Sequence, residues 1–147
     1  MESIKSFDEL SVGQEFRFGT MAMPLEDVLD FARRWDPQPF HTDEARARES
    51  AYGGLIASGI HTLAAAFGHM IRSGFVERVS MGGTGLELRW PAPVRPGDEI
   101  ALHGLVEELT PSRSRSDRGA AKFRYTGTRV SDGAAVIEIV ATHIFKR

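Results

Sequence analysis

The sequence predicts an α+β domain in which an antiparallel sheet wraps around one central apolar helix. After one strand, helical patterns fill the first half of the chain and strand patterns the second, a segregation typical of the α+β class. The helical pattern at about 58–74 is apolar nearly all round, as in a buried helix, and contains no Asp or Glu. A chain of 147 residues has the length of one domain, so we assign 1–147 to a single domain.

The chain opens with a strand and then a helix. Residues 14–22 alternate between apolar and polar side chains, which predicts a strand. Pro24 opens a helix whose apolar residues recur at helical spacing as far as Trp35, with acidic residues in its first turn and arginines in its last. The Asp36-Pro37 pair ends this helix, because proline disfavours helical backbone in the residue before it.

A long connection at 36–57 leads to the buried helix. Within it, we expect Thr42 to cap a short helix that runs to about Ser50. Ser58 is the expected cap of the buried helix itself. A connection of this length is unusual unless it carries function, so we look for chemistry here.

Strand patterns follow at four places in the second half: 84–94, 99–110, 120–130 and 134–145. Pro91 and Pro93 predict a bulge or an edge in the first of them, since proline cannot donate to a sheet. The last is apolar on both faces, which predicts a central strand covered on both sides. Because one helix covers only one face of the sheet, we expect a homodimer to cover the other.

Composition excludes several classes of function. Lys and Arg number 18 against 20 Asp and Glu, a balance that argues against a nucleic-acid-binding protein. The absence of cysteine excludes disulfides, thiolate nucleophiles and cysteine-bearing metal sites. The first 16 residues carry charge in every short window and no 18-residue stretch is apolar, so we expect neither a signal peptide nor a membrane span. We therefore expect a cytoplasmic protein.

The strongest local motif is DPQPFH at 36–41, which places two prolines between a carboxylate and an imidazole. Proline fixes φ, so the segment is stiff and both side chains are held at a low entropic cost. A carboxylate and an imidazole one water molecule apart can activate that water as general base and acid. The structural alternative is that Asp36 caps backbone amides at the helix end and His41 lies on the surface.

A second motif, GGLIASG at 53–59, opens the buried helix. Glycine at a helix start lets a ligand approach the free backbone amides closely. These amides and the helix dipole can polarise a carbonyl oxygen as negative charge develops on it, and the N–H of Gly59 is the natural donor. The structural alternative is that the glycines serve turns and close packing.

Other clusters carry weaker signals. Five histidines suggest a metal, but His61 and His69 lie eight residues apart on the predicted helix rather than four, so we expect no metal site. Arg113, Arg115 and Arg118 have the chemistry to bind the phosphates of a long ligand, although a solvated hairpin loop explains them as well.

Three segments, taken together, carry a family resemblance: DPQPFHTD at 36–43, YGGLIASG at 52–59 and RWPAPVRPGD at 89–98. The chain resembles the MaoC-like, (R)-specific enoyl-CoA hydratase family of hot-dog proteins. The order and separation of the segments match as well, and the similarity covers roughly 7–145. The resemblance implies a hot-dog fold paired into a dimer, with acyl-CoA thioesters bound near the dimer interface.

The resemblance also implies roles for particular residues. Asp36 and His41 would activate the water that adds to a trans-2-enoyl thioester, or protonate the hydroxyl that leaves in reverse. The Gly59 amide would stabilise the enolate-like oxygen. The substrate is an acyl thioester of CoA or of acyl-carrier protein, and no cofactor is implied. The residues expected to bind it are Pro39, Gly54, Ile56, Ser58 and Phe67.

The sequence departs from the family pattern at three positions. Gln38 stands where members usually have Asn, Ser58 where many have His, and Phe67 about where some hydratases have Ser. These changes leave Asp36 and His41 in place but alter the pocket floor, so we expect a change in the accepted acyl chain.

Two further functions stay open for the same fold. A hot-dog thioesterase usually has an acidic residue on or near the central helix, and 58–74 contains none, although Glu49 lies upstream. A non-catalytic acyl-CoA-binding protein would keep the pocket without the reaction. Release of free CoA separates a thioesterase from a hydratase, because hydration liberates no thiol.

Overall fold

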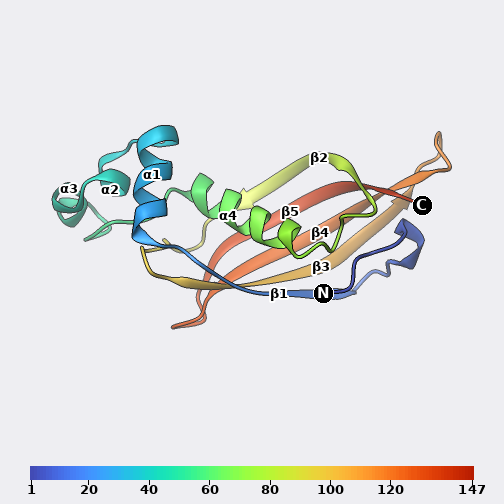
Figure 1. Ribbon diagram of the computed structural model, residues 1–147, viewed down its shortest axis with the longest axis horizontal. Helices are drawn as coiled ribbons and strands as arrows, with labels where there is room; N and C mark the ends of the chain where they lie inside the picture. Colours follow the sequence, from blue (N-terminus) through green and yellow to red (C-terminus); the bar gives the residue numbers. More distant parts are fainter.

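Five antiparallel strands form a single curved sheet in the order β1-β3-β4-β5-β2 (Figure 1). The computed structural model describes residues 1–147. The strands are β1 (Glu15–Ala22), β2 (Ser80–Arg89), β3 (Glu99–Pro111), β4 (Arg118–Arg129) and β5 (Ala135–Lys146). The helices are the 3-10 turn η1 (Phe7–Glu9), α1 (Leu25–Trp35), α2 (Pro39–Thr42), α3 (Glu44–Glu49) and α4 (Gly59–Arg72).

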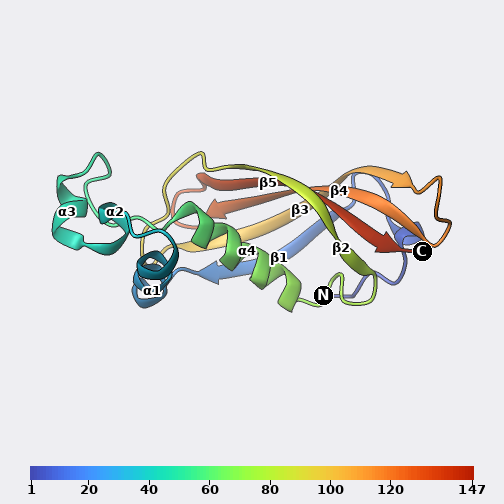
Figure 2. The same ribbon diagram turned by 90° about the horizontal axis from the view of Figure 1, so that it is seen from above.

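The helix α4 lies along the concave face of the sheet, as both ribbon views show (Figures 1 and 2). Ala66 and Met70 point into the core and are almost fully buried. The predicted α+β class, with a sheet wrapped around an apolar helix near 58–74, is therefore confirmed. No helix of the protein is both long enough and apolar enough to cross a lipid bilayer.

Aromatic side chains fill much of the space under α4. The rings of Phe18 and Phe75 meet edge to face at 4.8 Å, and those of Phe123 and Tyr125 stack at 5.5 Å. Burial of such a side chain stabilises the fold by about 1.5–3 kcal/mol. The alternating pattern of β4 is thus explained, because its apolar residues face the helix and its charged residues face outward.

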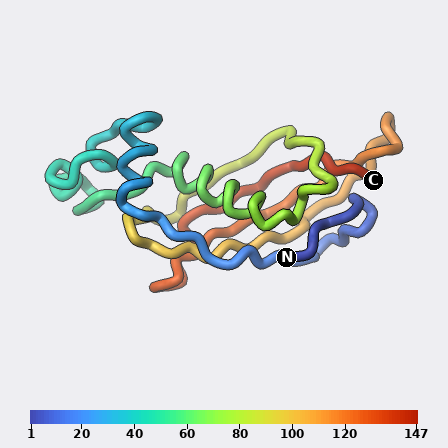
Figure 3. The backbone as a smooth tube through the Cα atoms, viewed as in Figure 1, coloured from blue at the N-terminus to red at the C-terminus, as the bar shows by residue number.

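The three helices α1, α2 and α3 gather beyond one end of the sheet, at the end where α4 begins (Figure 3). We call this segment, residues 24–58, the overhang. The long connection predicted at 36–57 is most of it, and it brings its residues over the N-terminus of α4.

Two predicted boundaries are wrong. Asp43, rather than Thr42, caps the short helix: its carboxylate accepts a hydrogen bond from the Arg46 amide at 3.0 Å. The strand predicted at 84–94 instead ends at Arg89, since prolines at 91 and 93 cannot donate to β5. It also begins earlier, at Ser80, because its glycines pair with β5 through two register shifts.

Strand β5 has β4 and β2 on either side, so it is the interior strand that its composition predicts. Its outward residues Val140, Thr142 and Ile144 are half-buried in the single chain. They lie beside outward residues of β4, including Lys122 and Arg124. This outer face is thus more polar than the apolar pattern of β5 alone indicates.

Candidate active site

Asp36 and His41 both lie in the overhang, one at the end of α1 and the other inside α2. The Asp36 amide donates to the carbonyl of Ala32 at 2.9 Å and so closes the last turn of α1. Pro39 opens α2, where a missing N–H costs nothing. The single turn of α2 buries the His41 ring, which is only 4% exposed. His41 is therefore not the surface residue that the structural alternative required.

The two side chains face one another. Nε2 of His41 lies 3.3 Å from Oδ2 of Asp36, and Nδ1 lies 2.7 Å from the carbonyl oxygen of Ile56. A carbonyl only accepts hydrogen bonds, so Nδ1 carries the proton and Nε2 of the neutral ring is an acceptor. Nε2 and the carboxylate oxygen are then two acceptors side by side, an arrangement that suits a donor such as a water molecule or a hydroxyl group.

Two further side chains donate to the Asp36 carboxylate. The Ser58 hydroxyl lies 2.7 Å from Oδ2, and the Gln38 amide nitrogen lies 2.8 Å from Oδ1. Burial acts to raise the pKa of Asp36, but these two hydrogen bonds, together with the positive charge that His41 carries when it is protonated, outweigh it and lower that pKa below its usual value. The carboxylate is held ionised at neutral pH, as a general base requires.

Gly59 is the first residue of α4, and its amide makes no hydrogen bond within the chain. Its carbonyl accepts a hydrogen bond from the Trp90 indole at 3.0 Å. A Cβ at residue 59 would lie 2.4 Å from the Trp90 ring, so any other residue fits only if the ring or the helix moves. Close packing and a free amide therefore occur at the same residue, and the role of that amide as a donor to a substrate stays a prediction.

A cleft of about 630 Å³ joins these groups. Its walls come from the overhang, the first turn of α4, Val136 of β5 and the loop between β2 and β3. Among the predicted site residues, Asp36, His41, Ile56 and Gly59 line it. The other lining residues are Gln38, Phe40, Tyr52, Ala57, Ile60, Thr62, Trp90, Pro91, Ala92, Pro93, Val94 and Val136.

Four residues predicted to bind substrate lie outside this lining. Ser58 is fully buried behind Asp36, and Pro39 starts α2. Gly54 borders a different hollow, which Arg48 and Arg95 also line. Phe67 lies two turns farther along α4, where its ring stacks on that of His143 at 6.4 Å. Tyr52 and Trp90 line the cleft although the sequence analysis did not single them out, and both fall inside the segments that carry the resemblance.

The other predicted clusters have structural partners. No group of three or more His, Cys, Asp or Glu residues lies close enough to hold a metal ion. His69 bonds to the carbonyl of Phe18 at 2.8 Å, and His61 stacks on Phe31. Arg118 pairs with Asp117 in the hairpin between β3 and β4, at the end of the sheet away from the overhang.

The model of the MaoC-like domain family matches residues 8–129. The chain belongs to the MaoC-like domain family. Its fold is the hot-dog fold of that family, as predicted. YdeM of Bacillus subtilis, an uncharacterized protein, is 36% identical over 113 residues, which are 76% of this chain and 79% of YdeM.

Solved structures of MaoC-like proteins resemble the chain closely. The MaoC-like dehydratase from Rhodospirillum rubrum superposes with a TM-score of 0.88 at 36% identity, covering 97% of both chains. The (R)-hydratase from A. caviae, involved in PHA biosynthesis, gives a TM-score of 0.71 at 25% identity, covering 94% of this chain and 97% of the hydratase. The chain is thus a MaoC-like protein whose relatives include a dehydratase and a hydratase.

Proposed function

We propose that the protein catalyses the reversible addition of water to a trans-2-enoyl thioester, with coenzyme A as the carrier. The observation that carries the proposal is the pair of acceptors formed by Asp36 Oδ2 and His41 Nε2, 3.3 Å apart, in the cleft that also holds the free amide of Gly59. The name of the A. caviae relative, an (R)-hydratase, supports the same reaction.

The acceptor pair suits one water molecule, which can donate one hydrogen to each member. As the water oxygen forms a bond to C3 of the substrate, the pair takes one proton from it. The C2–C3 double bond becomes a single bond, and negative charge moves to the thioester oxygen. The pair then gives a proton to C2, so the hydroxyl and the hydrogen together account for the added water.

The Gly59 amide is the donor for the charge that develops on the thioester oxygen. It has no acceptor inside the protein, and it stands at the positive end of the α4 dipole. A donor that is already in place strengthens as charge develops and needs no reorganisation. In dehydration the same groups act in reverse, with a proton taken from C2 and returned to the leaving hydroxyl.

We further propose that the protein works as a homodimer. Strand β2 ends the sheet and is exposed over nearly its whole length, so its outer edge has no partner strand in one chain. Large apolar side chains are exposed on α4, on β2 and after it: Ile60, Ile71, Met81, Leu86 and Trp90. Ile60 and Trp90 also border the cleft, so a second copy on this side would complete its wall.

A thioesterase is the second candidate, and the position of Glu49 weighs against it. Glu49 ends α3, is exposed, and lies outside the lining of the cleft. α4 supplies no acidic residue to replace it. A binding protein without activity uses the same cleft, but binding alone does not explain the paired acceptors of Asp36 and His41. The cytoplasmic location stays a prediction.

The proposal is tested with a panel of trans-2-enoyl-CoA and 3-hydroxyacyl-CoA thioesters of increasing chain length. Conversion is followed in both directions by chromatography, and a thiol reagent reports any free CoA. We expect interconversion of the two thioesters without thiol release. Thiol release would favour the thioesterase, and tight binding without conversion would favour the binding protein.

A further inference from the structure

We propose that Arg95 is a positioning residue that holds His41 in its reactive tautomer by bracing the two walls of the cleft against each other. The proposal rests on the function proposed above for the part that concerns turnover. Arg95 follows directly on the loop that forms one wall, residues 90–94. Its guanidinium group, however, lies against the opposite wall.

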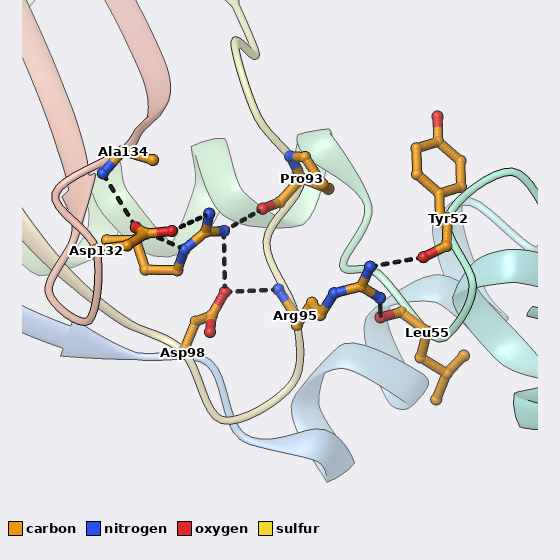
Figure 4. A network of polar contacts seen from close by, with 8 residues as sticks. Tyr52, Leu55, Pro93, Arg95, Asp98, Asp132 and Ala134 are labelled. Carbon is orange, nitrogen blue, oxygen red and sulfur yellow. Dashed lines mark hydrogen bonds and ion pairs between the residues drawn. The ribbon is translucent and has the colours of Figure 1, made fainter. Parts of the chain in front are cut away.

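The guanidinium donates to two carbonyl oxygens of one turn of the overhang. The distance is 2.6 Å to the carbonyl of Tyr52 and 3.3 Å to that of Leu55 (Figure 4). These carbonyls belong to a turn that contains no strand and no regular helix. A planar fork of donors can serve both at once, whereas an ammonium group is a single point of charge.

The two residues that Arg95 contacts are each linked to the imidazole of His41. Leu55 precedes Ile56, whose carbonyl oxygen fixes the proton on Nδ1 of His41 at 2.7 Å. The Tyr52 ring packs on Phe40 at 5.3 Å, and the Phe40 ring meets His41 edge to face at 4.6 Å. The turn that Arg95 holds is therefore the one that orients the ring from two sides.

The other end of the brace is fixed to the sheet. The Arg95 amide donates to the Asp98 carboxylate at 2.8 Å, and that carboxylate lies 3.5 Å from Arg129 at the end of β4. Arg129 also donates to the carbonyl of Pro93 at 2.7 Å and pairs with Asp132. Figure 4 shows this network running from the β4–β5 turn to Tyr52. These bonds thus fix the wall formed by residues 90–94 to the sheet, and the Arg95 side chain connects this wall to the overhang.

The sequence offers matched variants for a test. Arg95→Met removes the donors but keeps the length of the side chain, and Arg95→Lys keeps the charge with a single point of donation. Arg78→Met is the control, because Arg78 is an exposed arginine in the turn between α4 and β2, away from the cleft. Each variant is measured for kcat and KM, and its ¹⁵N-labelled imidazole signals are recorded near neutral pH.

We expect the His41 ring of the wild type to appear as the Nδ1–H tautomer, with the signal assigned by its loss in His41→Gln. In Arg95→Met this signal should change to a mixture of tautomers, and kcat should fall by about 10–100-fold with a smaller change in KM, as misplacement of a reacting group predicts. Arg95→Lys should lie between wild type and Arg95→Met, and Arg78→Met should match wild type within about twofold.

Three results would overturn the proposal: an unchanged His41 signal in Arg95→Met, a changed signal with full kcat, or an equal effect of Arg78→Met. If Arg95→Met does not fold, the same criteria apply to Arg95→Lys. Should the wild type hydrate none of the thioesters, the proposed function fails, and the tautomer signal alone then decides whether Arg95 positions His41.

Discussion

The buried hydroxyl of Ser58 donates to Oδ2 of Asp36 at 2.7 Å, on the same oxygen that faces His41. Ser58 stands at the N-cap of α4, but its side chain makes no capping bond to the helix. A serine at this position normally accepts a hydrogen bond from an amide of the first helical turn, whereas Ser58 uses its hydroxyl as a donor to the carboxylate. This contact opposes the effect of burial, which acts to raise the pKa of Asp36, since a hydrogen bond to the charged form favours that form.

Ser58→Ala should therefore shift the pH dependence of activity. Loss of the hydroxyl removes one of the hydrogen bonds that lower the pKa of Asp36, so that pKa rises and the carboxylate is protonated at a higher pH. The acidic limb of kcat/KM should move toward neutral pH, with less change on the alkaline side. A pH series on wild type and variant measures this shift. An acidic limb that stays in place would show that Ser58 does not tune Asp36.

Asp36→Asn and His41→Gln should each lower kcat by about 10²–10⁴-fold, the range typical of general acid–base groups. Asparagine cannot take a proton, and glutamine can meet the Ile56 carbonyl without acting as a base. Asp30→Asn is the matched control, because Asp30 is an exposed carboxylate on the same helix α1. Turnover is measured with the best thioester of the panel, and circular dichroism checks the fold. Wild-type turnover in either site variant would refute the assignment of the pair.

The Gly59–Trp90 contact predicts a packing effect that can be separated from catalysis. Gly59→Ala places a methyl group 2.4 Å from the Trp90 ring, so the ring or the helix must move. We expect a loss of about 1–3 kcal/mol in the free energy of unfolding, as overpacking costs, together with lower activity. Urea unfolding of Gly59→Ala, Trp90→Leu and the double variant measures the coupling.

In the double variant the methyl group has room. The loss in its free energy of unfolding should therefore be smaller than the sum of the losses in the two single variants. Additive losses in the cycle would mean that the ring does not restrict residue 59.

The sequence predicts the helix α4 and the strands to within a few residues, apart from the two ends of β2, because their hydrophobic periods are regular. The proximity of the Asp36 and His41 side chains is predictable as well, since the prolines at 37 and 39 indicate a stiff segment between them. These features are local, so a window of the sequence contains all that determines them.

Side-chain direction depends on residues far apart in the chain, so local patterns in the sequence do not determine it. The sequence predicts Ser58 as a helix cap and as a pocket residue. Its hydroxyl instead donates to the carboxylate of Asp36, 22 positions earlier in the chain. Trp90 falls inside the strand predicted at 84–94, yet it lies beyond the end of β2 and its indole donates to the carbonyl of Gly59 at the start of α4. Such contacts depend on how the overhang packs against the loop at residues 90–94. Hydrophobic periodicity does not determine this packing.

A buried polar pair in the core predicts that the fold weakens in mild acid. Nε2 of His143 lies 2.8 Å from the hydroxyl of Tyr125, and both residues are almost fully buried under α4. Burial lowers the pKa of His143 from 6.5 to about 4. Burial also lowers the pKa of His61, although nearby Asp27 opposes the shift.

The sign of the pH effect follows from these shifts. Between pH 6.5 and about 4 the unfolded chain binds a proton at His143 that the folded protein does not, so stability falls as the pH falls through this window. The loss attributable to His143 is about 3 kcal/mol, at about 1.4 kcal/mol for each pH unit. Urea unfolding at several pH values measures it directly. Tyr125→Phe/His143→Leu removes the titrating group without leaving a buried hydroxyl unpaired, so its stability should depend less on pH in this window. Equal slopes for wild type and double variant would show that His143 does not control acid stability.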